Sequence, residues 1–432
     1  MSSSFVKELT PQLIEWRRTF HALPELGFME YMTTYRIGKE LEGMGFTLHV
    51  GKDALEQDSR LGLPREDDLA AHEEKALNWG VEKEWLEKMR GGNTGLVATW
   101  DTGKRGDHVG FRFDIDALPI NECKEESHLP SKNGFVSGEE NVMHACAHDG
   151  HATIGLGVAK FIASHNDELK GRFTLLFQPA EEGGRGARPM RDRGWLDDVD
   201  AFYSGHIGIN SMNVGTIAAT TKGFLASTKF DITFKGVSSH AGMHPELGKN
   251  ALLAATTTAN NLYGIPRHHD GVSRVNVGKL IAGSARNIIP EDSFMEIELR
   301  GDTEEISDYM AEKATRIIKA AAEMHDVTYS VEPVGVTEVV VCDEELIPKI
   351  TAWCGPSEFV KEVLPDAPVS GSEDASLMMN RVQEHGGKAT YMLFGTKLDY
   401  PHHHPQFDYE EEVLAVAVDT FISILKGGSG DV

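Results

Sequence analysis

The order of predicted strands and helices changes twice along this chain, and this change constrains the fold more than any other feature of the sequence. Before about residue 225, a helical stretch separates stretches typical of buried strands, which read NTGLVATWDT, HVGFRFDID, GRFTLLFQ and DAFYSGHIG. The helical stretch GHATIGLGVAKFIASH lies between the second and third of them. This alternation predicts a mostly parallel sheet covered by helices.

Between about 225 and 333 the order becomes strand, helix, strand, strand, helix, strand. The helices are expected at NALLAATTTANNLYGI and ISDYMAEKATRIIKAAAEMHD, and the strands at STKFDITFKG, SRVNVGKLIAG, DSFMEIELRG and VTYSVEPVG. This order is that of the ferredoxin-like β-α-β-β-α-β unit. We therefore predict an α/β protein in which residues 225–333 form an inserted domain, whereas residues 1–224 and 334–432 form the first domain.

The alternating pattern resumes after the insertion, with a helix expected near 344–363, a strand at KATYMLFGT and a terminal helix at EEVLAVAVDTFISILK. Near the start, the spacing of apolar residues predicts helices at 11–23 and 31–45. The segment 51–95 is highly charged and contains the helical stretch AAHEEKALNWGVEKEWLEKM. We interpret it as a helical segment inserted between strands of the sheet. The default expectation for it is a solvated surface helix.

Charge and composition exclude several classes of partner. The 432 residues carry a net charge of −25, which argues against binding to nucleic acid or to an anionic membrane. No apolar run of about 18 residues could span a bilayer, and MSSSFVKELTPQ lacks the apolar core of a signal peptide. The four cysteines are widely spaced, so we expect a reducing, cytoplasmic compartment. An acidic substrate would need local cations, either metal or arginine.

Potential metal ligands lie at the ends of predicted strands or at the start of a helix. They are Asp114, Asp116, Cys146, His148, Glu181, Glu182, His206 and the run His402, His403 and His404. Singly, each has an ordinary explanation. The glutamate pair could be solvated, and the three histidines could form a surface turn. The nearby Asp149 could be a helix cap. Their placement on one edge of one sheet, with mixed N, O and S donors, favours a site for divalent transition metals.

A cysteine nucleophile is the alternative interpretation of the stretch MHACAHDGHA. Cys146 has histidines beside it and precedes a predicted helix, two features that activate a thiol. A cysteine–histidine enzyme, however, has no need of Glu181, Glu182, His206 and His403. The residues therefore favour the metal site.

These motifs resemble those of the M20 metallopeptidase and amidohydrolase family. RFDIDALP, MHACAHDGH, FQPAEEG, KGVSSHAGMHPELGKNAL, AGSARNIIP, SGSEDAS and HHHPQF occur in the order and at the spacing of that family, over nearly the whole chain. The cysteine-containing motif is similar to the branch that includes aminoacylases, indoleacetyl-amino-acid hydrolases and aminobenzoyl-glutamate hydrolases. Segment 51–95 is similar to an inserted segment of the aminobenzoyl-glutamate hydrolases.

The resemblance implies a catalytic α/β domain that binds two divalent metal ions, Mn²⁺ or Zn²⁺, and a smaller ferredoxin-like lid that mediates dimerisation. By position, Cys146 matches the thiolate that bridges the two metals. The matching terminal ligands are His148, Glu182, His206 and His403. We choose His403 because the family histidine stands four residues before a phenylalanine, here Phe407.

Other residues match family positions around the metals. Glu181 matches the general base. Asp116 lies where relatives have a supporting aspartate and Asp114 replaces a ligand histidine, so we expect both to support the ligands. Ala147 stands where the branch has glycine, and a positive φ there would cost about 1 kcal/mol.

The resemblance also assigns three lid residues. His240 matches a histidine that reaches across the dimer to the reacting carbonyl. Asn287 and Arg300 match residues that hold the terminal carboxylate of the substrate.

The implied reaction is hydrolysis of the amide bond of an N-aroyl or N-acyl amino acid, with p-aminobenzoyl-glutamate as the expected substrate. An indoleacetyl-aspartate hydrolase is one alternative, and a non-catalytic partner subunit that only binds metal or substrate is another. The expected partners are a small-molecule substrate and either a second copy of the chain or a homologous B subunit, with no nucleic acid and no membrane.

Overall fold

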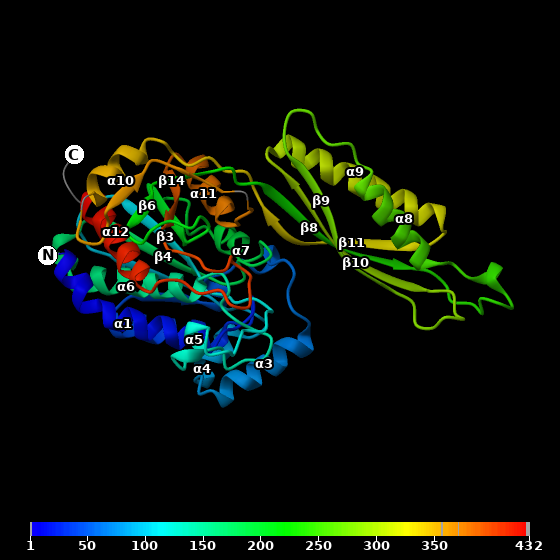
Figure 1. The fold of residues 1–432 in the computed structure, drawn as a ribbon, viewed down its shortest axis with the longest axis horizontal. Coiled ribbons are helices and arrows are strands. Elements are labelled where there is room, and N and C mark those ends of the chain that lie inside the picture. Colours follow the sequence, from blue (N-terminus) through cyan, green and yellow to red (C-terminus); the bar gives the residue numbers. More distant parts are fainter. Residues whose placement is uncertain (1, 356, 370, 429–432) are drawn as a thin grey trace.

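The computed structural model describes residues 2–355, 357–369 and 371–428. In this part of the chain, an eight-stranded sheet and a four-stranded sheet form two separate domains (Figure 1), and two short strands pair apart from them. The larger sheet has eight strands in the order β1-β2-β4-β3-β5-β14-β6-β12. In that order they are Thr47–Val50, Leu96–Asp101, Arg172–Gln178, His108–Asp114, Ala201–Ile207, Lys388–Phe394, Thr216–Ala218 and Glu362–Leu364. The central strands β4, β3, β5 and β14 are parallel, which confirms the predicted mostly parallel sheet.

Helices cover both faces of this sheet, because alternate side chains of its strands enter two different cores. On β4, Leu175 and Phe177 pack in one core, whereas Leu176 packs in the other. The first core is covered by α1, α6, α10 and α12 and the second by α7 and α11. These helices span Ser2–Ala22, His148–Ser164, Leu346–Cys354, Glu412–Gly428, Ala187–Asp192 and Ala375–Glu384.

Helices α6 and α12 pack against aromatic side chains of the sheet. A Cβ atom at Gly155 of α6 would lie 2.5 Å from Phe177 and 2.7 Å from Phe113, so only glycine lets this helix approach. On α12, the ring of Phe421 packs edge-on at 5.5–5.6 Å from rings on β3 and β14. This packing places the start of α6 beside the carboxyl end of β3, where the candidate ligands lie.

The inserted domain is a separate four-stranded antiparallel sheet in the order β11-β8-β10-β9. Its strands are Thr328–Thr337, Ala226–Lys235, Asp292–Gly301 and Ser273–Ala282, and its helices α8 and α9 are Ala251–Tyr263 and Glu304–Met324. Both helices cover one face and enclose a core of their own. This arrangement confirms the predicted ferredoxin-like insertion. The boundaries at 225 and 333 stay predictions, and β11 extends past the second of them.

Segment 51–95 differs from the expected solvated helix. It forms two helices, α3 (Glu66–Asn78) and α4 (Lys83–Met89), which a turn at Gly80 separates. Trp85, Leu86 and Met89 of α4 are buried in the main core. The segment is therefore part of the folded domain, because its apolar side chains pack against α2 (Tyr31–Met44).

The helix expected near 344–363 was predicted too long. Helix α10 ends at Cys354, and strand β12 follows at Glu362–Leu364. The sequence Gly355-Pro356 explains the early end, since proline disfavours helical geometry at the residue before it.

The remaining elements are short. Helix α5 spans Leu129–Lys132, and strands β7 (Thr221–Lys222) and β13 (Ala367–Pro368) pair with each other. Single 3₁₀ turns lie at Gly51–Asp53, Gln57–Ser59, Asn166–Glu168 and Pro245–Leu247. Within the described ranges, no helix is long and apolar enough to cross a membrane.

Candidate metal centre

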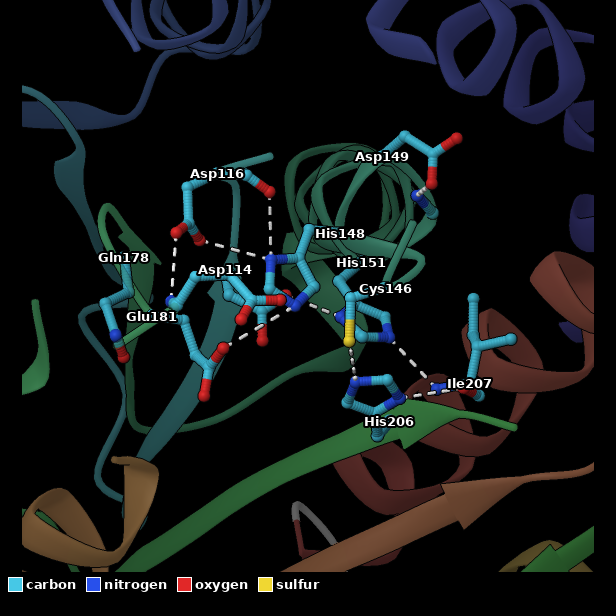
Figure 2. A network of polar contacts seen from close by, with 12 residues as sticks. Asp114, Asp116, Cys146, His148, Asp149, His151, Gln178, Glu181, His206 and Ile207 are labelled. Atoms are coloured by element: carbon cyan, nitrogen blue, oxygen red, sulfur yellow. Dashed lines mark hydrogen bonds and ion pairs between the residues drawn. The ribbon is translucent and has the colours of Figure 1, made fainter. Parts of the chain in front are cut away.

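The predicted ligands Cys146, His148 and His206 meet at the carboxyl edge of the parallel strands (Figure 2). Asp114 ends β3, His206 lies near the end of β5, and Glu181 and Glu182 follow β4. Helix α6 begins at His148 on the same edge. Parallel strands place their carboxyl ends together, which is why residues far apart in the chain form one cluster.

Cys146 is shared by two groups of potential ligands. Its Sγ lies 3.4 Å from Nε2 of His206. One group combines Cys146 with Glu182 and His403, and another combines it with His206 and His402, with ligand atoms within 4.8 Å of one another. This is the position that a bridging thiolate needs.

Two buried ligand atoms of the cluster have no hydrogen-bond partner among the described residues: Nε2 of His148 and Oε1 of Glu182. The other ring nitrogen of His148, Nδ1, lies 3.0 Å from the carbonyl oxygen of Asp116 and 3.1 Å from its Oδ1. That contact fixes the ring and presents Nε2 to the cluster, as in known metal sites. A buried polar atom without a partner is costly, so these residues fit divalent metal ions.

Added positive charge would stabilise the ionised forms of the acidic groups in the cluster. Burial raises the pKa of Glu181 well above its usual range, and Glu373 and Glu182 raise it further. Burial also raises the pKa of the Cys146 thiol, with Glu182 and Glu181 adding to the shift. A thiolate is therefore disfavoured here unless a cation is present. This disfavours the alternative in which Cys146 acts as a free nucleophile.

Asp116 and Asp114 lie behind the cluster. Oδ2 of Asp116 accepts a hydrogen bond from the backbone N–H of Glu182 at 3.0 Å, and its Oδ1 faces His148. Oδ2 of Asp114 lies 2.7 Å from Nη1 of Arg112, and its Oδ1 faces His151. Burial lowers the pKa of His148, but the neighbouring carboxylates of Asp114 and Asp116 outweigh this effect and raise the pKa to about 10. Asp116 thus orients the predicted ligands His148 and Glu182, whereas Asp114 holds Arg112 and His151.

Two neighbouring histidines reach the cluster from the loop after β14. Nε2 of His403, the histidine chosen from the sequence, lies 3.2 Å from Oε1 of Glu182, and its side chain is 53% exposed. His402 is more buried, and its Nε2 contacts the carbonyl oxygen of Ile207 at 3.1 Å. Nε2 of His403 thus faces another predicted ligand, whereas Nε2 of His402 faces a backbone carbonyl.

Left-handed backbone at non-glycine residues accompanies the predicted ligands. Ala147, Ala180 and His403 have φ angles of 64°, 48° and 65°. Each is a predicted ligand or lies next to a predicted ligand or the predicted base. Ala147 caps α6, so this position does require the positive φ that glycine adopts without strain. Such strain of about 1 kcal/mol or more at each residue is typical of functional sites.

Replacement of Ala147 by valine is expected to lower the free energy of unfolding by about 2 kcal/mol or more, because a β-branched residue is strained at positive φ and the site is buried. The same change should weaken metal binding by moving His148. Chemical denaturation and metal titration measure both effects.

The control for this prediction is Ala147→Gly, which relieves the strain but removes a buried methyl group worth about 0.8 kcal/mol. Its stability and metal affinity should stay near those of the unmodified chain. A valine variant as stable as the glycine variant would contradict the role of the positive φ.

The inserted domain contributes Arg300 to the site. Arg300 lines a cavity of about 550 Å³ together with Cys146, Glu181 and His206. His240 and Asn287 lie elsewhere: they follow the far end of β8 and precede β10, and the N–H of Ala241 bonds the carbonyl oxygen of Asn287 at 3.0 Å. A single chain thus brings one of the three predicted lid residues to the metal cluster.

A buried ionic group beside the cluster, centred on Arg112, was not predicted from the sequence. Arg112 is 1% exposed, and its Nη2 lies 2.9 Å from Glu373 and 3.1 Å from Asp374. Glu373 also lines the cavity. The available signals were an arginine inside an otherwise apolar strand and the acidic pair in SGSEDAS. Arg112 ties β3 to the loop before α11.

Asp149 has a different role from the helix cap considered above. The cap residue of α6 is Ala147. Oδ2 of Asp149 instead accepts a hydrogen bond from Nε of Arg17 at 3.1 Å and contacts Nδ1 of His21 at 2.8 Å. Asp149 therefore anchors the start of α6, and with it His148, to α1.

The chain is similar to proteins of one known family. Residues 110–427 match the model of peptidase family M20/M25/M40. The indole-3-acetyl-aspartic acid hydrolase of Enterobacter agglomerans is 42% identical over 97% of this chain and 96% of its own. A subunit of the p-aminobenzoyl-glutamate hydrolase of Escherichia coli is also 42% identical, with the same coverage.

A solved structure is similar over the whole length. The aminobenzoyl-glutamate utilization protein from Klebsiella pneumoniae superposes with a TM-score of 0.84 at 38% identity, over 98% of this chain and 97% of its own. The family match covers well over half of the chain, and the relatives cover nearly all of it. The chain therefore belongs to peptidase family M20/M25/M40 and is an amidohydrolase.

Proposed function

We propose that the chain hydrolyses the amide bond of an N-acyl amino acid, and that its substrate is p-aminobenzoyl-glutamate, which yields p-aminobenzoate and glutamate. The observation that carries the proposal is a pair of buried ligand atoms beside Glu181, Nε2 of His148 and Oε1 of Glu182. Neither forms a hydrogen bond among the described residues, and the second lies 3.2 Å from another proposed ligand, His403. The relatives with 42% identity act, by their names, on an aromatic acyl group joined to an acidic amino acid.

The metal site of this proposal contains Cys146 as the shared ligand and His148, Glu182, His206 and His403 as terminal ligands. Two divalent ions, Mn²⁺ or Zn²⁺, would supply Lewis acidity that activates water and polarises the amide carbonyl. A thiolate suits zinc, and the oxygen and nitrogen donors also suit manganese.

Glu181 is the proposed general base. Its Oε2 lies 3.9 Å from Nε2 of His148, and its side chain is 13% exposed, so it borders the cluster while facing the cavity. It would accept a proton from the attacking water and then deliver that proton to the leaving amine. Asp116 orients His148 and the backbone of Glu182 during this step.

Arg300 is the proposed anchor for the terminal carboxylate of the substrate, because a guanidinium pairs with a carboxylate through two parallel hydrogen bonds. In this proposal Asn287 and His240 come from the lid of a second protomer, and His240 stabilises the negative charge on the carbonyl oxygen. Their distance from the cluster in one chain is the reason for invoking a second protomer.

A dimer through the inserted domain is part of the proposal, either with a second copy or with a homologous B subunit. Strand β9 is the edge of its sheet, and large apolar side chains are exposed on β9 and α8, including Ile281 at 57% and Leu253 at 47%. An exposed strand edge with apolar neighbours is typical of a surface that another chain covers. We place the protein in the cytoplasm, as its cysteine usage indicates.

Indoleacetyl-aspartate is the second candidate substrate, because a hydrolase of that conjugate is as similar to this chain as the aminobenzoyl-glutamate enzyme. Both conjugates join a flat aromatic acid to an acidic amino acid. A non-catalytic partner subunit is disfavoured, since the chain keeps Glu181 together with the full set of proposed ligands.

The test is a hydrolysis panel with the purified chain loaded with Mn²⁺ or Zn²⁺. We expect release of p-aminobenzoate from p-aminobenzoyl-glutamate, with slower cleavage of indoleacetyl-aspartate and of N-acetyl amino acids, and loss of activity after chelation. If the metal-loaded chain cleaves these conjugates only once a homologous chain is supplied, Glu181→Gln in that mixture decides which chain is catalytic. Activity that survives this substitution would make the present chain the non-catalytic partner.

A further inference from the structure

A second cation lies beside Arg300 in the wall of the metal cavity. Lys229 is on β8, and it lines the same cavity as Arg300, Cys146 and Glu181. Glu298 of β10 is its direct partner across the sheet. These residues project from the face of the sheet that α8 and α9 leave uncovered, since the alternate residues Ile297 and Leu299 enter the core beneath the helices.

Glu298 contacts both cations at once. Its Oε1 accepts a hydrogen bond from Nη2 of Arg300 at 3.1 Å, and its Oε2 lies 3.0 Å from Nε of the same side chain. The ammonium of Lys229 lies 3.7 Å from Oε1, and Ser227 donates to that oxygen at 3.0 Å. One carboxylate thus sits between two cations and fixes their separation, so these three side chains together carry one net positive charge.

Three cavities meet at Lys229, Glu298 and Arg300. The metal cavity contains all three charged residues, a second cavity of about 640 Å³ shares Lys229 and Glu298 with it, and a third of about 580 Å³ shares Arg300 and Glu298. The cations therefore face open space large enough for a ligand. Burial lowers the pKa of Lys229, although Glu298 and Glu181 oppose this shift, so an additional anion would stabilise its charge.

We propose that Lys229 is a specificity-determining residue: it binds the side-chain carboxylate of an acidic amino acid, while Arg300 binds the terminal carboxylate. This inference rests on the proposed hydrolysis of N-acyl amino acids and adds the reason for selecting glutamate or aspartate. On a chain with a net charge of −25, two cations held by one carboxylate supply the local attraction that a dianionic substrate requires.

The test compares p-aminobenzoyl-glutamate with p-aminobenzoyl-glutamine, which has the same shape but a neutral side chain. Lys229→Met should lower kcat/KM for the glutamate conjugate by about 10-fold or more, mainly through KM, because one partner of a desolvated charge pair is lost. The glutamine conjugate should change by less than about 3-fold, the scale expected when no charge pair is broken. Lys229→Arg should restore most of the preference.

The control is Lys388→Met. Lys388 pairs with Asp343 at 3.3 Å at the start of β14, outside the inserted domain, and it is 41% exposed and does not line the metal cavity. This variant should keep the activity of the unmodified chain on both conjugates. Equal losses on both conjugates in Lys229→Met, or no preference for glutamate in the unmodified chain, would overturn the inference.

Calorimetry with free glutamate and glutamine separates this inference from the proposed function. Tighter binding of glutamate to the metal-loaded chain, lost in Lys229→Met, supports the inference even if the unmodified chain hydrolyses neither conjugate, in which case the proposed function alone fails. Equal binding of the two amino acids by the unmodified chain would refute the role of Lys229.

Discussion

Replacement of Glu181 by glutamine is expected to lower kcat by about 100-fold or more, the scale of general-base loss, while the chain still binds metal. Glutamine has the shape of glutamate but cannot accept and return a proton. Glu181 borders the proposed ligands without being one of them, since Glu182, and not Glu181, contacts the proposed ligand His403. Steady-state kinetics and metal analysis of the same sample measure the two effects.

The control for this prediction is Glu358→Gln. Glu358 is half exposed and pairs only with Lys7 among the ion pairs of the described chain, at 2.6 Å on the surface. Its loss should leave kcat unchanged. Turnover of Glu181→Gln at the level of the unmodified chain would remove Glu181 from the mechanism, and loss of metal from that variant would make Glu181 a ligand instead.

Replacement of Cys146 by serine is expected to remove bound metal and, with it, activity. Cys146 belongs to two ligand groups, so its loss affects both predicted metal positions. A serine hydroxyl stays protonated at neutral pH and cannot replace a thiolate as a shared ligand. We expect metal affinity to fall by about 100-fold or more, beyond the 10–100-fold typical of residues that only orient a ligand. Metal analysis after dialysis measures this loss.

Cys123→Ser is the matched control, because Cys123 is also a partly buried free cysteine but belongs to none of the ligand groups above. It should keep both metal and activity. A Cys146→Ser chain that retains its metal but loses activity would restore the cysteine nucleophile, in spite of the raised pKa of that thiol.

The comparison of sequence with structure is clearest at Ala147. The sequence identified this residue as a departure from the family pattern, but its φ of 64° depends on where α6 begins. Similarly, the acidic pair in SGSEDAS was visible, whereas its contact with Arg112 joins residues more than 250 positions apart. Contacts over such separations leave no periodic signal in a single sequence.

The lid residues also show that a single sequence does not reveal contacts between distant residues. Spacing and resemblance identified His240, Asn287 and Arg300 together, yet in the folded chain Arg300 alone of these lines the metal cavity. Lys229 carried no signal at all in the sequence, since a lysine in the predicted strand STKFDITFKG resembles any residue on a solvated strand face. Its importance follows from the register that pairs it with Glu298.

By itself, the sequence determined the two kinds of domain, the strand ends that carry the predicted ligands and the family, because periodicity, element order and motif spacing are local properties of the chain. The tertiary structure alone decided the sheet order β11-β8-β10-β9, the buried atoms of His148 and Glu182 that form no hydrogen bond among the described residues, and the pairing of Lys229 and Arg300 through Glu298. These depend on packing and register between distant segments, where a shift of one residue moves every side chain to the opposite face.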